Sequence, residues 1–250
     1  MAALADGSCE RSGSSSRFLT SLEEESIMAN ADPIPADVMD LIARSSTGMV
    51  KDALAMSGIK GGVMGIRPIR GFEDAKVIGR AATVLFSSPR VGTSKLNNYQ
   101  VIENTPAGSV LVIDGKGFDG HFAGDNQGAM AKRQGLAGIV VYGGARDLAG
   151  YRAIGMPLYC TGSATRDKPA ELQLTAYNVP IEIGGVTVKP GDIIVADEDG
   201  VVVVPDEAIG LLMANMKTIF EVEEEMEKAI ESGASAEQLS AIIAKKKPKR

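Results

Sequence analysis

Two short polar stretches follow apolar strand-like runs and carry residue types that could do chemistry together. They are "GDNQG" at 124–128 and "GGARD" at 143–147. Ligands in open α/β sheets bind beyond the carboxyl ends of the strands, and these two stretches flank one expected helix. An arginine suits a bidentate contact to a carboxylate, and an aspartate suits a hard divalent cation that keeps several waters. The sequence therefore predicts that both stretches converge on one ligand.

The first stretch opens a helix that is expected to end at Gly135. Unpaired backbone N–H groups at such a helix start favour a carboxylate or a phosphate. The glycine at position 124 would let a small anion approach the backbone closely. The alternative interpretation is that Asp125 only caps the helix.

The second stretch places Arg146 and Asp147 at the expected start of the next helix. Adjacent side chains diverge by about 100° on a helix, so the two could address different parts of one ligand. The alternative is an exposed helix start, at which Asp147 is favoured by the helix dipole. Taken alone, the dipeptide does not decide between the two.

Alternating strands and helices must position these stretches. Short Val- and Ile-rich runs at 77–88, 109–115, 138–144 and 156–162 are typical of strands, and helical segments at 124–135 and 146–155 separate the last three. This order predicts a parallel, buried sheet. Two short helices should precede it, one capped by Asp37 and carrying Val38, Leu41 and Ile42, the other over 46–58.

The chain after Asn178 is almost entirely β in pattern, with hairpin signals at "GG", "KPGD" and "DEDG". A long amphipathic helix should then run from Asp206 to about Ile230. The fold class is therefore α/β, with a parallel strand–helix–strand core, an antiparallel β-rich segment and a C-terminal helix. A doubly wound nucleotide-binding fold is disfavoured, because the run at 109–115 is not followed by a G-x-G-x-x-G turn.

Composition divides the chain into three parts. Residues 1–30 are rich in Ser, Gly and Glu and are expected to be a disordered arm, 31–234 should form the folded domain, and 235–250 a helical, basic tail. The final run "KKKPKR" should be solvated and disordered. A net charge of −6 argues against a general nucleic-acid surface. No apolar run approaches the ~20 residues that span a membrane, and no apolar leader is present, so a cytoplasmic protein is expected.

Jointly, these motifs resemble the RraA-like family, which includes 4-hydroxy-4-methyl-2-oxoglutarate (HMG) aldolases. The family pattern is a glycine–acid pair about twenty residues before G-x-x-R-D, followed by a β-rich segment. Here these are "AGDNQGAMAKRQGLAGIVVYGGARD" and "IGGVTVKPGDIIVADEDGVVVVP". The resemblance covers roughly Pro35 to Gly233 and implies an α/β/β/α layered domain.

The resemblance also implies a metal-dependent (class II) pyruvate aldolase that uses Mg²⁺ or Mn²⁺, acts on small 2-oxoacids and decarboxylates oxaloacetate. Asp147 resembles the metal ligand and Arg146 the group that holds the pyruvate moiety. Asp125 resembles the acid that positions metal-bound water. The backbone amides around Gly124, Asp125, Asn126 and Gln127 resemble the carboxylate cradle, although Asn126 and Gln127 stand where aldolases often have apolar residues.

Family members assemble as trimers or hexamers, and a glutamate from a neighbour's terminal helix completes the site. The stretch "FEVEEEMEK" offers Glu223 and Glu224 as candidates, beside Glu221 and Glu225. One branch of the family instead regulates ribonuclease E and lacks the aspartate after the arginine. A non-catalytic regulator that binds a protein partner is therefore the alternative function, and the presence of Asp147 favours the enzyme.

Other features suggest chemistry less strongly. Lys132 could form a Schiff base, but an exposed surface lysine is the commoner case. His121, the single histidine, is expected to have a structural or loop role more than a substrate contact. "DEDG" lacks the remaining ligands of a calcium loop and should be a turn. A methyltransferase would need a glycine-rich cofactor loop, and none is evident.

Overall fold

A computed structural model of the protein describes residues 32–91 and 94–247. The expected disordered arm over 1–30 lies outside these residues. The boundaries 31–234 and 235–250 remain predictions. Across the described ranges, no helix is both long and apolar enough to cross a membrane.

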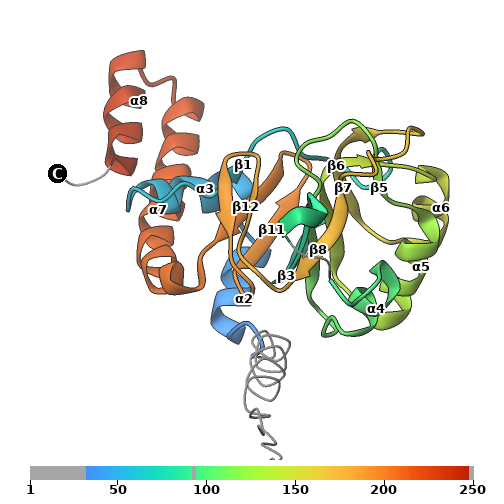
Figure 1. Ribbon diagram of the computed structural model, residues 1–250. Helices are drawn as coiled ribbons and strands as arrows, with labels where there is room; N and C mark the ends of the chain where they lie inside the picture. The colour runs from blue at the N-terminus through green and yellow to red at the C-terminus, as the bar shows by residue number, and fades with distance from the viewer. Residues whose placement is uncertain (1–31, 92–93, 248–250) are drawn as a thin grey trace, which may run out of the picture.

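A ten-stranded mixed sheet runs through the molecule, and its four central strands are parallel (Figure 1). Their Val- and Ile-rich sequences are largely buried, as parallel strands with both faces covered require. This confirms the expected parallel core. The central strands are β3 (Val77–Ser87), β4 (Val110–Asp114), β6 (Gly138–Ala145) and β7 (Leu158–Ser163).

Three helices pack near the β7 side of the sheet, and each lies between two neighbouring parallel strands in the chain order (Figure 1). They are α4 (Asn98–Glu103), α5 (Asp125–Gln134) and α6 (Leu148–Ile154). Helix α5 ends at Gly135, whose φ of 82° is left-handed, so the predicted end is confirmed. Because β4, β6 and β7 are parallel, the segments that lead from β4 to α5 and from β6 to α6 both lie at the carboxyl ends of these strands.

Shorter strands complete the sheet, and a separate hairpin covers part of it. Strand β12 pairs with β11 through the "DEDG" turn, and β10 pairs with β9 through "GG", so both hairpin predictions are confirmed. These strands are β1 (Gly62–Val63), β2 (Arg67–Pro68), β5 (His121–Ala123), β8 (Gln173–Tyr177), β9 (Ile181–Ile183), β10 (Val186–Val188), β11 (Ile193–Asp197) and β12 (Gly200–Val204).

The predicted hairpin at "KPGD" is wrong. Strand β10 pairs with β9, whereas β11 pairs with β3 and β12, so the chain crosses here from the small sheet to the large one. The turn itself forms: Gly191 has a φ of 91°, and Asp192 Oδ2 accepts a hydrogen bond of 2.7 Å from Lys189 N. A Pro-Gly pair reverses the chain locally but does not determine which strands pair.

The two N-terminal helices form where the sequence predicts them. Helix α2 (Ala36–Ala43) buries Val38, Leu41 and Ile42, but its cap is Pro35, and Asp37 lies inside the first turn. Helix α3 (Thr47–Ala55) is capped by Ser46, which accepts a hydrogen bond from Met49 N at 3.2 Å. A 3₁₀ turn at Pro89–Val91 follows β3.

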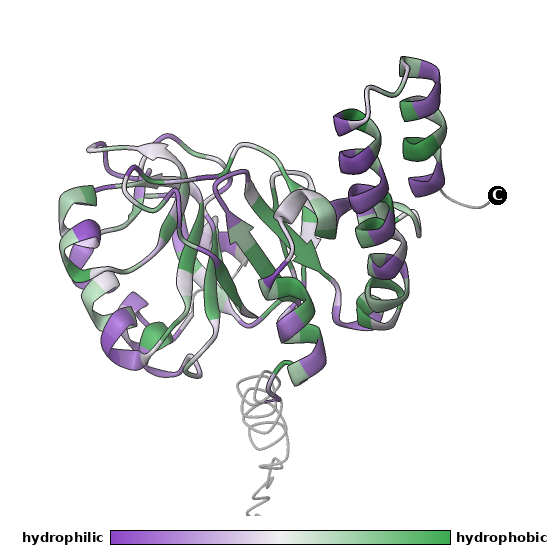
Figure 2. Cartoon of the chain, turned by 180° about the vertical axis from the view of Figure 1, so that it is seen from behind, coloured by the Kyte–Doolittle hydropathy of each residue, from purple (hydrophilic) through white to green (hydrophobic). Residues whose placement is uncertain are grey.

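The C-terminal segment is a helical hairpin that extends beyond the sheet (Figure 1). A 3₁₀ turn (Asp206–Ala208) leads into α7 (Ile209–Glu231), followed by α8 (Ala236–Ile243) and a second 3₁₀ turn (Ala244–Lys246). Figure 2 shows polar residues over much of the projecting part of the hairpin. Helix α7 is amphipathic, as predicted, and buries Leu212, Met216 and Ile219, whereas Ile230 near its end is exposed.

The expectation that the basic run is solvated and disordered is wrong for its first residues. Lys245 pairs with Glu225, and Lys246 pairs with both Glu223 and Asp52. These contacts fold the tail back onto α7 and α3. Residues 248–250 lie outside the described part of the chain.

Candidate active site

The two polar stretches meet because a short strand, β5, precedes the first of them. Strand β5 runs parallel to β6, with Ala123 opposite Ala145. Arg146 N donates a hydrogen bond of 3.0 Å to Ala123 O across this junction. Gly124 and Arg146 therefore leave the sheet side by side. The sequence predicts the convergence but misses β5, since three residues are too few to show a period.

Gly124 is the N-cap residue of α5, with an extended backbone and no side chain to satisfy the first N–H groups. Asp125 is the first helical residue, so the interpretation of Asp125 as a simple cap is wrong. Gly124 O accepts from Gln127 N at 3.1 Å and Gly128 N at 3.2 Å. The N–H groups of Asp125 and Asn126 precede the first intrahelical donors and are the ones a helix start leaves for an anion.

A side chain at position 124 would crowd the second stretch. A Cβ atom built on Gly124 would lie 3.1 Å from Asp147 Oδ2 and 3.6 Å from Arg146 Nε. The glycine thus admits the Arg146 and Asp147 side chains to the helix start. This adds a packing reason to the predicted role of Gly124 in anion approach.

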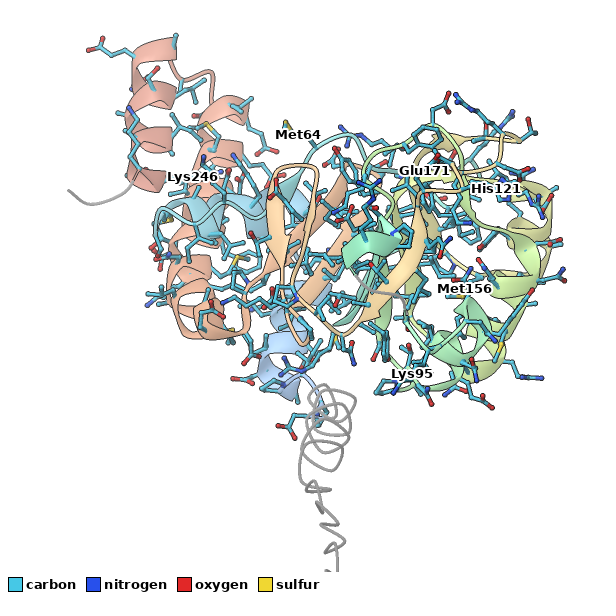
Figure 3. The ribbon with its side chains drawn as sticks, in the orientation of Figure 1. Met64, Lys95, His121, Met156, Glu171 and Lys246 are labelled. Atoms are coloured by element: carbon cyan, nitrogen blue, oxygen red, sulfur yellow. The ribbon has the colours of Figure 1, made fainter. Side chains whose placement is uncertain are left out.

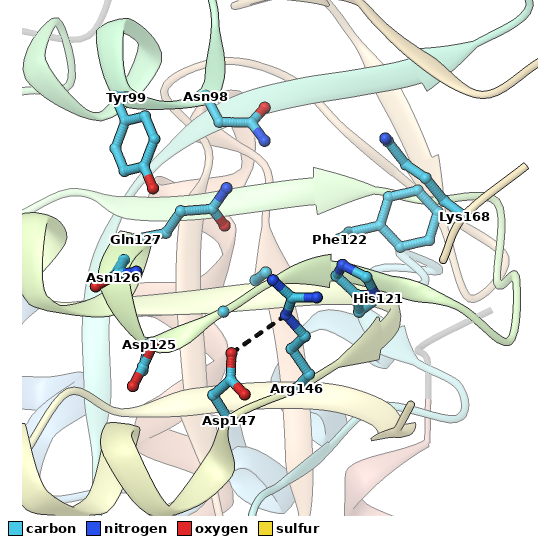
Figure 4. Close-up of a pocket in the computed structure, with 12 residues that line it drawn as sticks. Asn98, Tyr99, His121, Phe122, Asp125, Asn126, Gln127, Arg146, Asp147 and Lys168 are labelled. Atoms are coloured by element: carbon cyan, nitrogen blue, oxygen red, sulfur yellow. Dashed lines mark ion pairs between the residues drawn. The ribbon is translucent and has the colours of Figure 1, made fainter. Parts of the chain in front are cut away.

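Arg146 and Asp147 do not diverge as two residues on a helix would. Arg146 precedes α6, and Asp147 is its N-cap residue, with a left-handed backbone (φ 59°, ψ 38°). Arg146 Nε lies 3.2 Å from Asp147 Oδ2, and both side chains are about half exposed (Figure 4). The predicted divergence is therefore wrong, because the left-handed residue ends the strand before the helix begins. Aspartate is among the few non-glycine residues that tolerate this conformation.

These side chains line a cavity of about 140 Å³ beside the start of α5. All residues predicted for the ligand and the metal within one chain lie on its wall. Figure 4 shows the Arg146 guanidinium extending into the cavity, with Asn98 and Tyr99 across from it beyond Gln127. The lining residues are Asn98, Tyr99, His121, Phe122, Ala123, Gly124, Asp125, Asn126, Gln127, Arg146, Asp147 and Lys168.

Other lining side chains come from segments that the sequence did not assign to the site. Asn98 and Tyr99 begin α4, whose capping box at Asn97 and Gln100 is a readable helix-start signal. Phe122 belongs to β5. Lys168 follows "CTGSATRD" (160–167), which comes after the fourth expected strand, but the sequence favours convergence of the other two strand ends.

His121 holds the segment that carries Lys168. Its Nδ1 lies 2.9 Å from Arg166 O, and its Nε2 lies 3.6 Å from Asp167 Oδ1. His121 also lines the cavity, so it combines the structural role expected from the sequence with a place at the site. The cavity wall thus carries two cations, Arg146 and Lys168, beside the helix start.

The carboxylates at the site fit Mg²⁺ or Mn²⁺ better than a metal ion that is coordinated by protein ligands alone. Within residues 32–91 and 94–247, no group of three or more His, Cys, Asp or Glu could hold a metal ion. Mg²⁺ usually keeps several waters and binds through one or two carboxylates together with substrate oxygens. Asp147 offers such a carboxylate, and Asp125 lies on the same wall.

Two other predicted features lie elsewhere. Lys132 Nζ donates to Gly155 O at 3.0 Å, and Lys132 is absent from the cavity lining, as expected of a surface lysine. Asp197 of "DEDG" accepts hydrogen bonds from Thr47 N and Oγ1 and from Asp199 N, which makes this stretch a turn.

The candidate glutamates of α7 do not reach the cavity of their own chain. Glu223 pairs with Lys246 and Glu224 pairs with Lys228. Figure 3 shows Lys246 and the cavity residue His121 toward opposite ends of the molecule. Any contact of these glutamates with a site must therefore be made to another copy of the chain.

Known proteins share sequence similarity with this chain. The chain is 33% identical to protein DlpA of Legionella pneumophila over 213 residues. The aligned region covers 84% of this chain but only 34% of DlpA. The chain thus spans about a third of the length of that relative. It is 35% identical over 138 residues to the 4-hydroxy-4-methyl-2-oxoglutarate aldolase of Thermus thermophilus, covering 55% of this chain and 80% of that protein.

A solved structure shares the fold. Streptomyces coelicolor RraAS2, described as an unusual member of the RNase ES inhibitor RraA protein family, superposes with a TM-score of 0.68. The sequence identity is 32%, and the similarity covers 79% of this chain and 98% of RraAS2. The model of the family RraA-like (Aldolase/RraA) matches residues 37–203, which include every cavity residue. The chain belongs to the RraA-like family.

Proposed function

We propose that the protein is a metal-dependent carbon–carbon lyase. It cleaves 4-hydroxy-2-oxoacids such as HMG to pyruvate and a second oxoacid, and it decarboxylates oxaloacetate through the same pyruvate enolate. The observation that carries the proposal is the convergence of Arg146, Asp147 and the start of α5 on one cavity. The name of the T. thermophilus relative supports the same reaction class.

Each part of the cavity has a task in this reaction. The free N–H groups at the start of α5 and the Arg146 guanidinium bind the 1-carboxylate and the 2-oxo group of the substrate. Asp147 would hold Mg²⁺ or Mn²⁺, which acts as a Lewis acid toward the developing enolate. Asp125 takes up the proton of the 4-hydroxyl group, directly or through a water, as a general base.

The second cation suits the far end of the substrate. HMG and oxaloacetate carry a carboxylate at each end, and Lys168 lies on the cavity wall together with Arg146. A lysine acts as a point charge toward such a group, whereas the planar guanidinium of Arg146 suits the oriented pyruvate end. The cavity thus favours small dicarboxylic 2-oxoacids. We also propose a homotrimer or homohexamer, in which Glu223 or Glu224 of a neighbour completes the site.

Pyruvate release from HMG and oxaloacetate tests the reaction. Wild-type protein should release pyruvate with Mg²⁺ or Mn²⁺, lose this activity in EDTA and regain it when the metal is restored. Asp147→Asn, which keeps the shape of the side chain, should lose the metal-stimulated turnover. Turnover that survives exhaustive chelation would exclude the metal-dependent route.

The alternative, a non-catalytic regulator, is supported by the similarity to RraAS2. A regulator would inhibit a ribonuclease of the E type through its surface, without need of the cavity carboxylates. Inhibition of RNA cleavage that Asp147→Asn leaves unchanged, combined with no turnover on any 2-oxoacid, would favour this function over the lyase.

A further inference from the structure

Tyr151 of α6 has a hydroxyl group that lacks a partner in the described structure. The residue is fully buried, and its Oη is the one buried side-chain polar atom of the described ranges without a hydrogen bond. Tyr159 of β7 is equally buried, yet its Oη donates to Ala75 O at 2.9 Å. Leaving a buried polar group unpaired is energetically costly, so such a group requires an explanation.

The Tyr151 ring packs directly beneath the helix that carries Asp125. A Cβ atom built on Gly128 of α5 would lie 2.6 Å from Tyr151 Cε1 and 3.0 Å from its Cζ. Asp125 precedes Gly128 by three residues, so both face the same side of α5. Asp125 packs on Gly150, the residue before Tyr151 in α6. A Cβ atom built on Gly150 would lie 2.5 Å from Asp125 Cβ. Gly150 and Tyr151 therefore pack against the first turn of α5, Gly150 beneath Asp125 and Tyr151 beneath Gly128.

The electrostatic surroundings keep the Tyr151 hydroxyl protonated. Burial, and next to it the negative charge of Asp125, raise the pKa of Tyr151 well above its ordinary value. Cys160 and Asp147 add to the same shift. The Cys160 thiol is already engaged with Gly162 O at 3.3 Å. A tyrosine that remains a donor therefore packs against the first turn of α5, which also carries Asp125, and a carboxylate is a strong acceptor.

We propose that Tyr151 is a positioning residue for Asp125. When a ligand fills the cavity, the Tyr151 hydroxyl donates a hydrogen bond to the Asp125 carboxylate, directly or through one buried water. This bond fixes the orientation in which Asp125 handles the substrate proton. The inference rests on the proposed function, because the role of Asp125 does. It also explains why the fold retains an unpaired hydroxyl beneath the helix start.

Two buried tyrosines give a matched pair of variants for the test. Tyr151→Phe removes an unpaired hydroxyl, so its melting temperature should equal or exceed that of the wild type. Its kcat for pyruvate release should fall about ten-fold with KM unchanged, as expected for the loss of one hydrogen bond to a charged group. Tyr159→Phe should show the opposite: a lower melting temperature, because Ala75 O loses its donor, and an unchanged kcat.

Replacing Tyr151 by 4-aminophenylalanine restores a donor at the same place and should recover part of the lost kcat. A wild-type kcat in Tyr151→Phe, a melting temperature lowered as in Tyr159→Phe, or a kcat loss that the amino group does not recover would each overturn the positioning role. If wild-type protein releases no pyruvate from HMG or oxaloacetate, the proposed function fails, and this role fails with it. An active wild type with an unaffected Tyr151→Phe removes the positioning role alone.

Discussion

Asp147 combines a functional side chain with a costly backbone. Its left-handed conformation costs a non-glycine residue about 1–2 kcal/mol, and such residues cluster at active sites. The conformation turns the carboxylate back toward Arg146 and Gly124 instead of along α6. Asparagine shares the tolerance for this conformation, whereas alanine does not. Asp147→Asn therefore separates the loss of the carboxylate from a loss of stability, which Asp147→Ala would not.

Gly150 gives a test of Asp125 that leaves the Asp125 side chain itself intact. In Gly150→Ala the added methyl group would lie 2.5 Å from Asp125 Cβ, so Asp125 must shift, and turnover should fall roughly a hundred-fold, as misplaced catalytic groups can cause. Stability should fall as well, because rotation of the Asp125 side chain cannot relieve a contact at its Cβ atom. Steady-state kinetics and urea unfolding measure the two effects.

The matched control is Gly210→Ala in α7. No atom lies within 4 Å of a Cβ atom built there, so this variant should be stabilised without any change in kcat. Wild-type kinetics in Gly150→Ala would show that the position of Asp125 does not matter for turnover.

Among the residues of the cavity, only some could be predicted from the sequence. Gly124, Asp125, Arg146 and Asp147 lie at strand ends that local patterns reveal, so their convergence is predictable. Lys168 also lies beyond the end of a predicted strand, but the sequence does not show that its segment folds onto the same cavity. The unpaired hydroxyl of Tyr151 is a property of packing in three dimensions, and no residue spacing indicates it.

At the scale of elements, the long strands and the glycine-terminated helices are predictable, because their apolar periods and stop signals are local. Strand β5 and the pairing of β11 with β3 are not, since a three-residue strand shows no period and β3 is distant from β11 in sequence. The fold of the C-terminal tail is also not predictable from its own sequence. The run at 245–250 has the composition of a solvated tail, but acidic residues on α7 and α3 bind its first lysines.

Lys246 should stabilise the C-terminal hairpin in a pH-dependent way. Desolvation lowers the pKa of Lys246, but hydrogen bonds and charges from Glu223 and Asp52 outweigh it and raise the pKa above its ordinary value. A raised lysine pKa contributes stability that is complete below about pH 10.4, the unfolded value, and is lost as the pH rises through the folded pKa. Lys246→Met should therefore cost about 1 kcal/mol at neutral pH, after allowance for the solvent screening of its partners.

Urea unfolding of wild type and Lys246→Met from pH 7 to 12 measures this difference, which should shrink toward zero above pH 10.4. Lys228→Met serves as the control, since the Lys228–Glu224 pair is exposed on both sides and should contribute less. A stability difference for Lys246→Met that stays constant across this range would contradict the ion-pair explanation.

At the scale of the whole molecule, the cavity and the helical hairpin lie toward opposite ends (Figure 3). The hairpin exposes apolar side chains on α7 and α8, Ile230 at 59% and Ile243 at 44%. Met64, 70% exposed, lies at the surface of the sheet region. Glutamates on a projecting helix cannot serve their own cavity, but in a closed ring each copy can offer its helix to the next.

Mixing two inactive variants decides whether sites are shared between copies. Asp147→Asn lacks the proposed metal ligand, and the double variant Glu223→Gln/Glu224→Gln lacks the glutamates that a neighbour would offer. Each should be nearly inactive alone. If they are mixed, unfolded and refolded together, random assembly gives some sites an intact Asp147 and an intact neighbouring helix. Their activity should reach about a quarter of the wild-type value.

The same mixture, with each variant refolded separately before mixing, is the control, because subunits that do not exchange form no hybrid sites. Light scattering should show one assembly larger than a monomer in every sample. A double variant that keeps full activity would remove Glu223 and Glu224 from the site. Two inactive variants that recover nothing after joint refolding into an oligomer would show that each site is built from one chain, since every hybrid assembly would then contain only defective sites.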